Sequence, residues 1–332
     1  MTIVSTTTAA TKPKRMNWQR NVIPKVQEFL GLSSYRPTMR GTFYRLVSDN
    51  IITNIFKNYK GLIQALSLAR EKSPDEEGYI SVYAFADNTR FIEDIDDEFW
   101  SPEEFVDYHI NILQNAGTYY LKNGYLTRWH NQLNYVEVMI EKNALRGAFK
   151  DILSEINVPI VPNNGWSSKI YTQKNIDRLV AHKRGNAGNG EGPKEVYVLY
   201  FGDYDPTGLR MSDNIERDFE KHGINFERVG LNKQHISEYS LDHLRNPDPE
   251  VMKKLKKDAN REIFKAQNNG ELFQIELDAL QKSEQQFKSL ILDAVNKYYD
   301  KSIYQENLRK FTADSINIIN PPVTLYQLSE YR

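Results

Sequence analysis

The middle of the chain carries the sequence VYVLYFGDYDPTGL at residues 196–209, in which six apolar residues run directly into two aspartates and a Pro/Gly turn. An unbroken apolar run of this length is typical of a central strand in a parallel sheet that is covered on both faces. Open α/β sheets place their ligand sites at the carboxyl ends of such strands. We therefore expect Asp203 and Asp205 to lie at the edge of a sheet where a ligand binds.

A second apolar run also ends in an acid, which turns an isolated Asp-x-Asp pair into a candidate metal site. Residues 135–140 lead into Glu141, while Asp203 and Asp205 are two positions apart and point to one side of an extended chain. Carboxylates that meet at neighbouring strand ends suit a hard cation such as Mg²⁺, for which Mn²⁺ can substitute. The alternative is a turn in which an aspartate caps the following helix, with Pro206 in its first turn.

The composition allows two domains of ordinary size and excludes cysteine chemistry. The chain has 332 residues and no cysteine, which excludes disulfides, thiolate nucleophiles and cysteine-based zinc sites. It has no recognisable signal peptide and no apolar run long enough to span a membrane. We therefore expect a cytoplasmic protein without membrane contact, associated with the nucleoid if the cell is prokaryotic.

The formal net charge of −1 hides a strong polarity along the chain. Residues 1–72 hold twelve Lys/Arg and three acids, a net charge of +9, whereas residues 73–107 hold twelve acids and one arginine, a net charge of −11. A basic segment of this kind is expected where a protein binds the phosphate backbone of double-stranded DNA. An exposed basic face without a partner is the alternative explanation.

The first 130 residues are predicted to form a flexible basic arm, residues 1–16, and a winged helix-turn-helix domain with a helical connection, residues 17–130. Helical patterns cover residues 18–32 and 38–47 and a third segment around residues 57–72, and residues 80–85 alternate like a strand or wing. An apolar stripe over residues 105–120 predicts the connecting helix. The third helix carries Lys57, Lys60 and Arg70 outside its apolar face, so we expect it to enter a DNA groove.

From residue 131 to residue 332, strands and helices alternate, which predicts an α/β domain with a mostly parallel sheet and a helical C-terminal extension. Strands are expected at residues 136–140, 158–161, 196–201 and 224–229, and a lysine-rich helix is expected to run through Phe264. The glycine-rich residues 184–193 lack the Lys-Ser/Thr of a phosphate loop and are interpreted as a flexible connection. Because no ATP-binding signature is apparent, any ATP dependence would come from a separate ATPase subunit.

Arg40 and Tyr44 are one turn apart in the second predicted helix and therefore share a face. A tyrosine hydroxyl, with a reference pKa of about 10, is a poor nucleophile at neutral pH. A nearby guanidinium and a metal ion assist it by stabilising the phenolate and a pentacovalent phosphate. The alternative is a buried ring beside a solvated arginine, the commoner situation in a chain with 20 tyrosines.

These motifs occur in the order found in the type IIB DNA topoisomerase A subunit family, which includes the topoisomerase VI A subunit and the meiotic double-strand-break initiator. The chain resembles that family over most of residues 18–235, through Arg40-x-x-Phe43-Tyr44, Glu141-Lys142, Gly165-x-Ser167, Asp203-Tyr204-Asp205-Pro206-Thr207-Gly208 and Val229-Gly230-Leu231-Asn232-Lys233. Its length is closer to compact stand-alone relatives carried by mobile elements. Tyr204 replaces the small residue usual between the two aspartates, and Phe43 stands where topoisomerases often carry a second tyrosine.

The resemblance implies a Toprim domain in which Glu141, Asp203 and Asp205 hold Mg²⁺. It also implies that Tyr44 forms a 5′-phosphotyrosyl bond with DNA, assisted by Arg40 at the phosphate. Family members act as homodimers that cut both strands, with the tyrosine of one subunit meeting the metal site of the other.

Two other functions fit the same residues. In a Toprim hydrolytic nuclease, a metal-activated water would attack the DNA and Tyr44 would only position it. In a DNA-binding accessory protein of recombination, the same fold would bind DNA without catalysing its cleavage.

Overall fold

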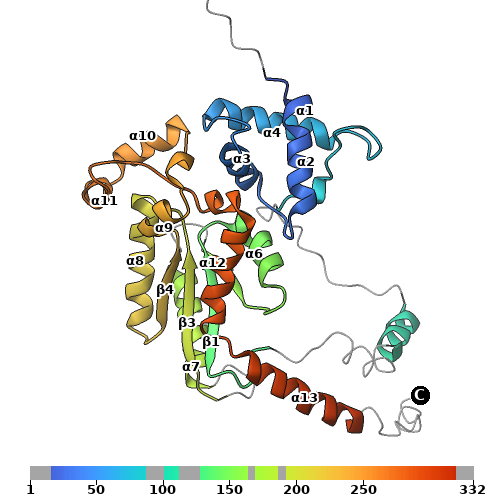
Figure 1. The fold of residues 1–332 in the computed structure, drawn as a ribbon. Coiled ribbons are helices and arrows are strands. Elements are labelled where there is room, and N and C mark those ends of the chain that lie inside the picture. Colours follow the sequence, from blue (N-terminus) through green and yellow to red (C-terminus); the bar gives the residue numbers. More distant parts are fainter. Residues whose placement is uncertain (1–15, 87–100, 112–127, 164–168, 186–191, 319–332) are drawn as a thin grey trace, which may run out of the picture.

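The computed structural model describes residues 16–86, 101–111, 128–163, 169–185 and 192–318 (Figure 1). The expected basic arm at residues 1–16 lies almost entirely outside the described residues, as do the Gly165-x-Ser167 motif and most of the glycine-rich segment 184–193. Within the described ranges, no helix is long and apolar enough to cross a lipid bilayer.

Helices and strands alternate through the described residues, so the fold is mixed α/β as predicted. The strands are β1 Asn134–Ile140, β2 Ile160–Pro162, β3 Glu195–Phe201 and β4 Asn225–Gly230. The α-helices are α1 Trp18–Asn21, α2 Ile23–Leu32, α3 Met39–Ser48, α4 Phe56–Arg70, a helix at residues 102–111, α6 Arg146–Leu153, α7 Lys169–Arg184, α8 Pro206–Glu220, α9 Lys233–Glu238, α10 Pro249–Lys257, α11 Arg261–Gln267, α12 Glu284–Asn296 and α13 Lys301–Ile318. The 3₁₀ turns are η1 Val82–Ala84, η2 Asn143–Leu145, η3 Asp242–Leu244 and η4 Leu277–Lys282.

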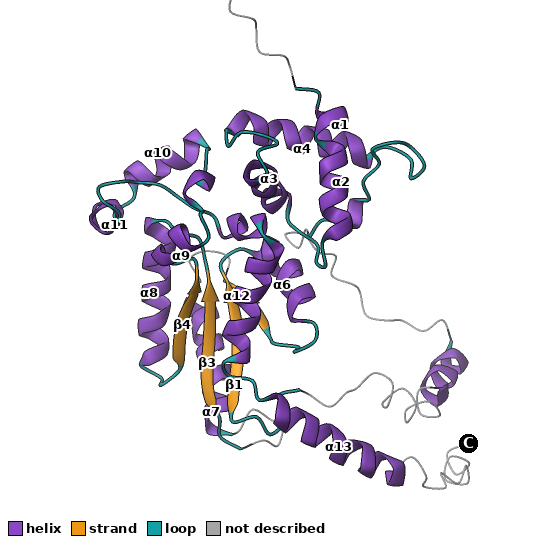
Figure 2. Ribbon diagram, in the orientation of Figure 1, coloured by secondary structure: helices purple, strands orange, loops and turns teal. Residues whose placement is uncertain are grey.

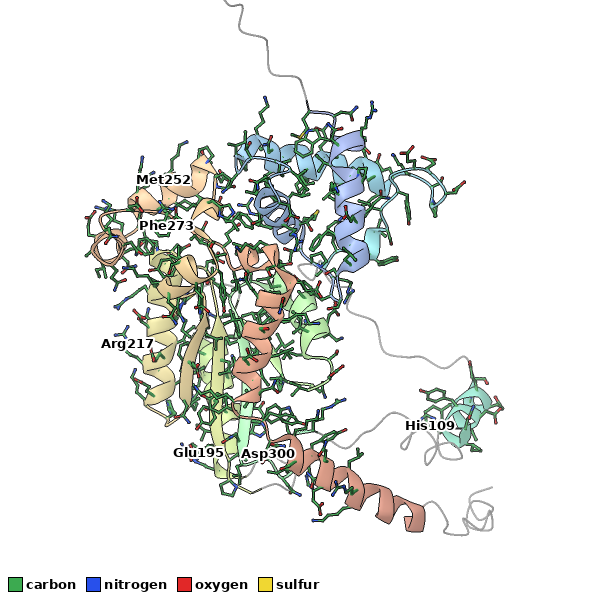
Figure 3. All side chains as sticks on the ribbon, in the orientation of Figure 1. His109, Glu195, Arg217, Met252, Phe273 and Asp300 are labelled. Atoms are coloured by element: carbon green, nitrogen blue, oxygen red, sulfur yellow. The ribbon has the colours of Figure 1, made fainter. Side chains whose placement is uncertain are left out.

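The described strands form a four-stranded parallel sheet in the order β2-β1-β3-β4. β3 lies between two neighbours, and its pairing with β1 runs from Asn134 opposite Glu195 to Ile140 opposite Phe201. The prediction of a central parallel strand at residues 196–201 is therefore confirmed. All strands point the same way, so their carboxyl ends share one edge of the sheet, at the end opposite Glu195 (Figure 3).

Alternate side chains of β3 face different helices, which is why nearly all of them are apolar. Val198 and Tyr200 belong to an apolar cluster with side chains of α7 and α8, whereas Leu199 and Phe201 belong to a cluster with side chains of α6 and α12. Figure 2 shows α12 in front of the strands and α7 behind them. The strand is thus buried on both faces, as an unbroken apolar run requires.

The N-terminal helices form where they are expected, but the predicted strand or wing at residues 80–85 is wrong. This segment contains the 3₁₀ turn η1, in which the Ser81 side chain accepts a hydrogen bond from the backbone of Tyr83. Val82 and Tyr83 are 57% and 81% exposed, so the alternating pattern faces no sheet among the described residues. Short side-chain caps of this kind compete with extended structure.

Two helical predictions need correction. The helix expected at residues 18–32 is divided into α1 and α2, with Pro24 in the first turn of α2. The lysine-rich helix expected to run through Phe264 ends at Lys257 and restarts at Arg261, because the Asp258 side chain accepts from the backbone of Asn260 and closes a turn. The connecting helix is confirmed at residues 102–111, where several apolar side chains are exposed, and the rest of the prediction lies outside the described residues.

The predicted winged-helix part packs against the α/β part through α3, which lies directly on η4. The backbone N–H of Thr38 donates to Gln281 Oε1 at 2.9 Å, and Gln281 Nε2 donates to Thr38 Oγ1 at 3.0 Å. Gly41 permits this close approach, since a Cβ at that position would lie 2.4 Å from Gln281 Cδ. Side chains of both parts belong to one continuous apolar core.

A buried ion pair fixes α7 to the sheet. The side chain of Glu137 in β1 is 0% exposed, and its two carboxylate oxygens accept from the two terminal nitrogens of Arg178, with Nη2 to Oε1 at 2.8 Å. The Tyr135 hydroxyl also donates to Glu137, at 3.3 Å. A carboxylate at this depth is tolerated because the bidentate guanidinium compensates for its lost hydration.

Arg178→Ala is expected to lower the free energy of unfolding by about 3 kcal/mol, because it leaves a buried carboxylate without its cation. The double variant Glu137→Gln/Arg178→Ala should lose less, since the side chain that remains is neutral. Urea denaturation of both variants measures the difference. Equal losses in the two variants would show that the charge of Glu137 is not what Arg178 compensates.

Candidate functional site

The ends of β1 and β3 bring Glu141 and the two aspartates together. Ile140 and Phe201 are paired in the sheet, and the next residue of β1, Glu141, donates its backbone N–H to Phe201 O at 2.8 Å. The carboxylate of Glu141 in turn accepts from the backbone N–H of Asp203 at 2.9 Å. Parallel pairing thus carries the acids of two distant segments to the same edge of the sheet.

Asp203 and Asp205 share a side of the chain, since Gln274 Nε2 donates to both carboxylates, at 3.5 Å in the case of Asp203. Asp205 also caps α8, because its Oδ1 accepts from the backbone N–H of Gly208 at 2.7 Å and Pro206 occupies the first turn. The capping interpretation of this motif therefore holds for Asp205, whereas the metal-site interpretation stays a prediction. Arg228 fixes the intervening turn by donating to Asp203 O at 2.6 Å and to Gly208 O at 3.1 Å.

These carboxylates hold protons more tightly than free acids do. Burial raises the pKa of Glu141, and the Asp205 carboxylate raises it further. Burial also raises the pKa of Asp203 well above its usual value, and Glu141 and Glu276 add to this effect against the opposing ammonium of Lys142. The pKa of Asp205 is raised mainly by burial. Like charges in a site of low polarity repel, and a bound cation would relieve the repulsion.

The donor atoms suit a magnesium ion, although the described side chains are not arranged around a metal position as they stand. Among the residues that the structure describes, no group of three or more His, Asp or Glu side chains has metal-binding geometry. Asp203 Oδ1 accepts from the backbone of Leu277 at 2.8 Å, and Oδ2 contacts Lys142 Nζ at 3.0 Å. Three carboxylates at one edge are ligands of the type that Mg²⁺ takes. Coordination would require the Lys142 and Gln274 side chains to turn away.

Lys142 joins these acids to a second acidic pair. Its ammonium lies 3.0 Å from Asp203 Oδ2, 3.1 Å from Glu276 Oε1 and 3.6 Å from Asp278 Oδ2. Although burial opposes the charge, these three carboxylates hold the pKa of Lys142 well above its usual value. Lys142 is therefore a fixed cation between the strand ends and the segment that precedes η4.

Tyr44 and Arg40 both contact Glu276, one member of this acidic pair. The Tyr44 side chain is 0% exposed, and its hydroxyl donates to Glu276 Oε2 at 2.9 Å. Arg40 Nε donates to the same oxygen, and the Arg40 guanidinium lies 4.2 Å from the ring centre of Tyr59 and 5.4 Å from that of Tyr44. Tyrosine, arginine and strand-end carboxylates thus belong to one network, which passes through Glu276 and Lys142.

The hydroxyl of Tyr44 is held as a neutral phenol. Burial raises its pKa well above 10, and the Glu276 carboxylate raises it further, while Arg40 opposes both. Glu276 itself stays ionised, because Lys142 and Arg40 outweigh burial and lower its pKa to about 2. The structure has the buried ring of the second alternative, but Arg40 is paired with an acid and is not solvated, and the nucleophilic role of Tyr44 stays a prediction.

The sequence analysis overlooked Gln274, Glu276 and Asp278, although a signal was present. Residues 273–278 alternate between the buried apolar side chains Phe273, Ile275 and Leu277 and these three polar ones. Ile275 pairs with Tyr204 as an isolated antiparallel bridge, which lays this extended stretch across the turn after β3. Phe273, labelled in Figure 3, lies at the start of the stretch. An alternating pattern of this kind places its polar residues on one side.

The basic residues expected to contact DNA all lie on α4, but not together. Lys57 and Lys60 are exposed near the start of the helix, and the Lys60 ammonium lies 4.6 Å from the ring centre of Phe56. Arg70 lies in the last turn and is half-buried, with its guanidinium 4.9 Å from the ring centre of Phe85. The two lysines remain available to a phosphate, whereas Arg70 has a packing role.

Comparison with known proteins returned no match to a family model, to a curated protein or to a solved structure.

The acidic edge predicts a stabilising effect of Mg²⁺ that depends on Asp205. In the presence of EDTA, Asp205→Asn should still fold, since the asparagine oxygen can cap α8, although its amide nitrogen cannot accept from Gln274. Millimolar Mg²⁺ should raise the Tm of the wild type by several degrees and that of the variant by less than half as much.

Thermal denaturation with and without Mg²⁺ tests this, with Asp213→Asn on the exposed side of α8 as the control. An undiminished Mg²⁺ shift in Asp205→Asn would remove Asp205 from the set of ligands.

Proposed function

We propose that this chain is a Mg²⁺-dependent DNA-cleaving enzyme similar to the A subunit of type IIB topoisomerases. In this proposal, the N-terminal helices are a winged-helix DNA-binding domain that lacks the expected strand, and the sheet belongs to a Toprim domain. The observation that carries the proposal is the network from Tyr44 and Arg40 through Glu276 and Lys142 to Asp203. This network supports the proposal because it connects the candidate nucleophile to one of the proposed metal ligands through two side chains.

The proposed reaction is a transesterification. The Tyr44 oxygen bonds to the phosphorus of a DNA phosphodiester and gives up its proton to solvent, while the 3′-oxygen leaves and takes up a proton. A 5′-phosphotyrosyl bond and a free 3′-hydroxyl result. Because the bond energy is retained, the 3′-hydroxyl can reverse the step and reseal the strand. Arg40 offsets the charge on the phosphate during attack. Mg²⁺ held by Glu141, Asp203 and Asp205 would supply further positive charge to the phosphate oxygens.

The family resemblance extends the proposal to the assembly. A homodimer would cut both strands of double-stranded DNA, and strand passage would require a separate ATPase subunit. In the single chain, Tyr44 is connected to Asp203 of the same chain through Glu276 and Lys142, so exchange of tyrosines between subunits would require α3 to part from η4.

Hydrolysis is the second candidate, and one observation favours it. The Tyr44 hydroxyl is fully buried, and its proton is held by a carboxylate. A hydrolytic nuclease with the same acids would use water as the nucleophile, and Tyr44 would then contribute only to packing and positioning.

Tyr44→Phe separates the two candidates, because phenylalanine keeps the ring and removes the oxygen. Wild-type protein incubated with DNA and Mg²⁺ or Mn²⁺ should give protein-linked 5′ ends on denaturing electrophoresis, and Tyr44→Phe should give neither adducts nor breaks. Tyr59→Phe, in the same pocket, should keep adduct formation within about tenfold of the wild type.

Mass spectrometry of nuclease-trimmed adducts identifies the linked residue. Robust DNA cutting by Tyr44→Phe would favour hydrolysis.

The exposed lysines of α4 predict salt-sensitive DNA binding. Lys57→Gln/Lys60→Gln should weaken binding to every duplex and reduce the slope of log K against log salt by about 2, one unit for each phosphate that a lysine no longer neutralises. The control is Lys301→Gln/Lys310→Gln on α13, which lies beyond the opposite end of the sheet (Figure 1). Fluorescence anisotropy over a salt series measures both. A wild-type slope in the α4 variant would place DNA elsewhere.

A further inference from the structure

The carboxylate of Glu276 fills a site that is built for an anion. Its Oε2 accepts from the Tyr44 hydroxyl at 2.9 Å and from Arg40 Nε, and its Oε1 lies 3.1 Å from Lys142 Nζ. A guanidinium, an ammonium and a hydroxyl therefore converge on one group. The Glu276 and Arg40 side chains are only 13% and 14% exposed, so little water competes for these contacts.

The same three donors recognise phosphate as readily as carboxylate. Both anions present oxygens that accept charge-assisted hydrogen bonds from Arg and Lys, and Arg is suited to either by its planar array of donors. The acids at the strand ends would repel a phosphate, so Arg40 and Lys142 are the described cations through which it could approach Tyr44. A phosphodiester attacked by Tyr44 would need the position that Glu276 holds.

We propose that Glu276 is an internal mimic of the DNA phosphate, and that the structure is a self-occluded state in which the phosphate site is filled by the chain itself. This inference rests on the proposed function of Tyr44. An attacking oxygen must come within about 3–3.5 Å of the phosphorus. Tyr44 is 0% exposed and its hydroxyl donates a hydrogen bond to Glu276, so a DNA duplex cannot reach it until Glu276 moves away from it.

Withdrawal requires the segment of Glu276 to part from α3. Glu276 immediately precedes η4, and η4 is held on α3 by the reciprocal hydrogen bonds between Thr38 and Gln281. The Thr38 hydroxyl also donates to Asp278. Separation of α3 from η4 would expose Tyr44 and Arg40 together, because both side chains belong to α3 and both donate hydrogen bonds to Glu276.

Glu276→Gln tests the occupancy without requiring DNA cleavage. Glutamine keeps the shape of the side chain but loses the charge, so an incoming phosphate competes with a weaker occupant. In EDTA, the variant should bind a short DNA duplex roughly tenfold more tightly than the wild type. The control is Glu271→Gln, which removes the same charge from an exposed carboxylate paired with Arg245. If Glu276→Gln binds no more tightly than Glu271→Gln, the inference fails.

A disulfide tests the opening directly, because the chain contains no cysteine of its own. In Gly41→Cys/Gln281→Cys, the two Cβ atoms start about 2.7 Å apart and must move to about 3.8 Å, the ordinary separation in a disulfide. The oxidised form should lose adduct formation by at least about a hundredfold, and reduction should restore it. Adducts formed equally fast by the oxidised form would show that the closed state is competent and would overturn the inference.

The two experiments also separate this inference from the proposed function. If neither the wild type nor the reduced cysteine variant forms adducts, while Glu276→Gln gains duplex affinity over its control, the phosphate site stands and the tyrosine chemistry fails. If the wild type forms adducts through Tyr44 but both tests of Glu276 and of opening are negative, the chemistry stands and the self-occlusion fails.

Discussion

The structure depends on the ammonium of Lys142, which holds acids from two separate segments at one edge of the sheet. It contacts Asp203 after β3 and both Glu276 and Asp278 before and within η4, while its chain neighbour Glu141 directly follows β1. Without this cation, the carboxylates would repel each other in surroundings that already raise the pKa values of Glu141 and Asp203. The proposed metal ligands and the proposed nucleophile are connected because Lys142 links Asp203 to Glu276.

The sequence predicts those parts of the fold whose signal is local and repeated. The run at residues 196–201 identifies the central strand because both faces are buried, and the acids that follow each strand could be placed together because parallel strands end at the same edge. The position of Arg40 and Tyr44 on one face followed from helix geometry alone. Predictions of this kind need only the spacing of apolar residues along the sequence and the direction of the strands.

Contacts between distant segments could not be predicted in this way. Glu276 lies 232 residues from its partner Tyr44, and its short alternating segment makes an isolated bridge instead of a longer strand among the described residues. The prediction of a strand at residues 80–85 was wrong because an alternating pattern forms a strand only when another strand pairs with it. Here the Ser81 side chain instead caps a local 3₁₀ turn. Period-two patterns identify which side chains share a side, whereas tertiary contacts decide what they meet.

The proposed role of Tyr44 as a nucleophile depends on the surface between α3 and η4, because the tyrosine is buried there. Its hydrogen bonds join Thr38 to Gln281 and to Asp278, and Arg45 to the backbone of Lys282. Because Gly41 has no side chain, the backbone of α3 lies directly against the side chain of Gln281. Polar groups of this kind can exchange their partners for water when a contact opens, whereas the apolar packing of α12 on the sheet cannot. The contact between α3 and η4 thus combines these polar pairs with apolar side chains of the continuous core, and the opening that we propose would expose both to water.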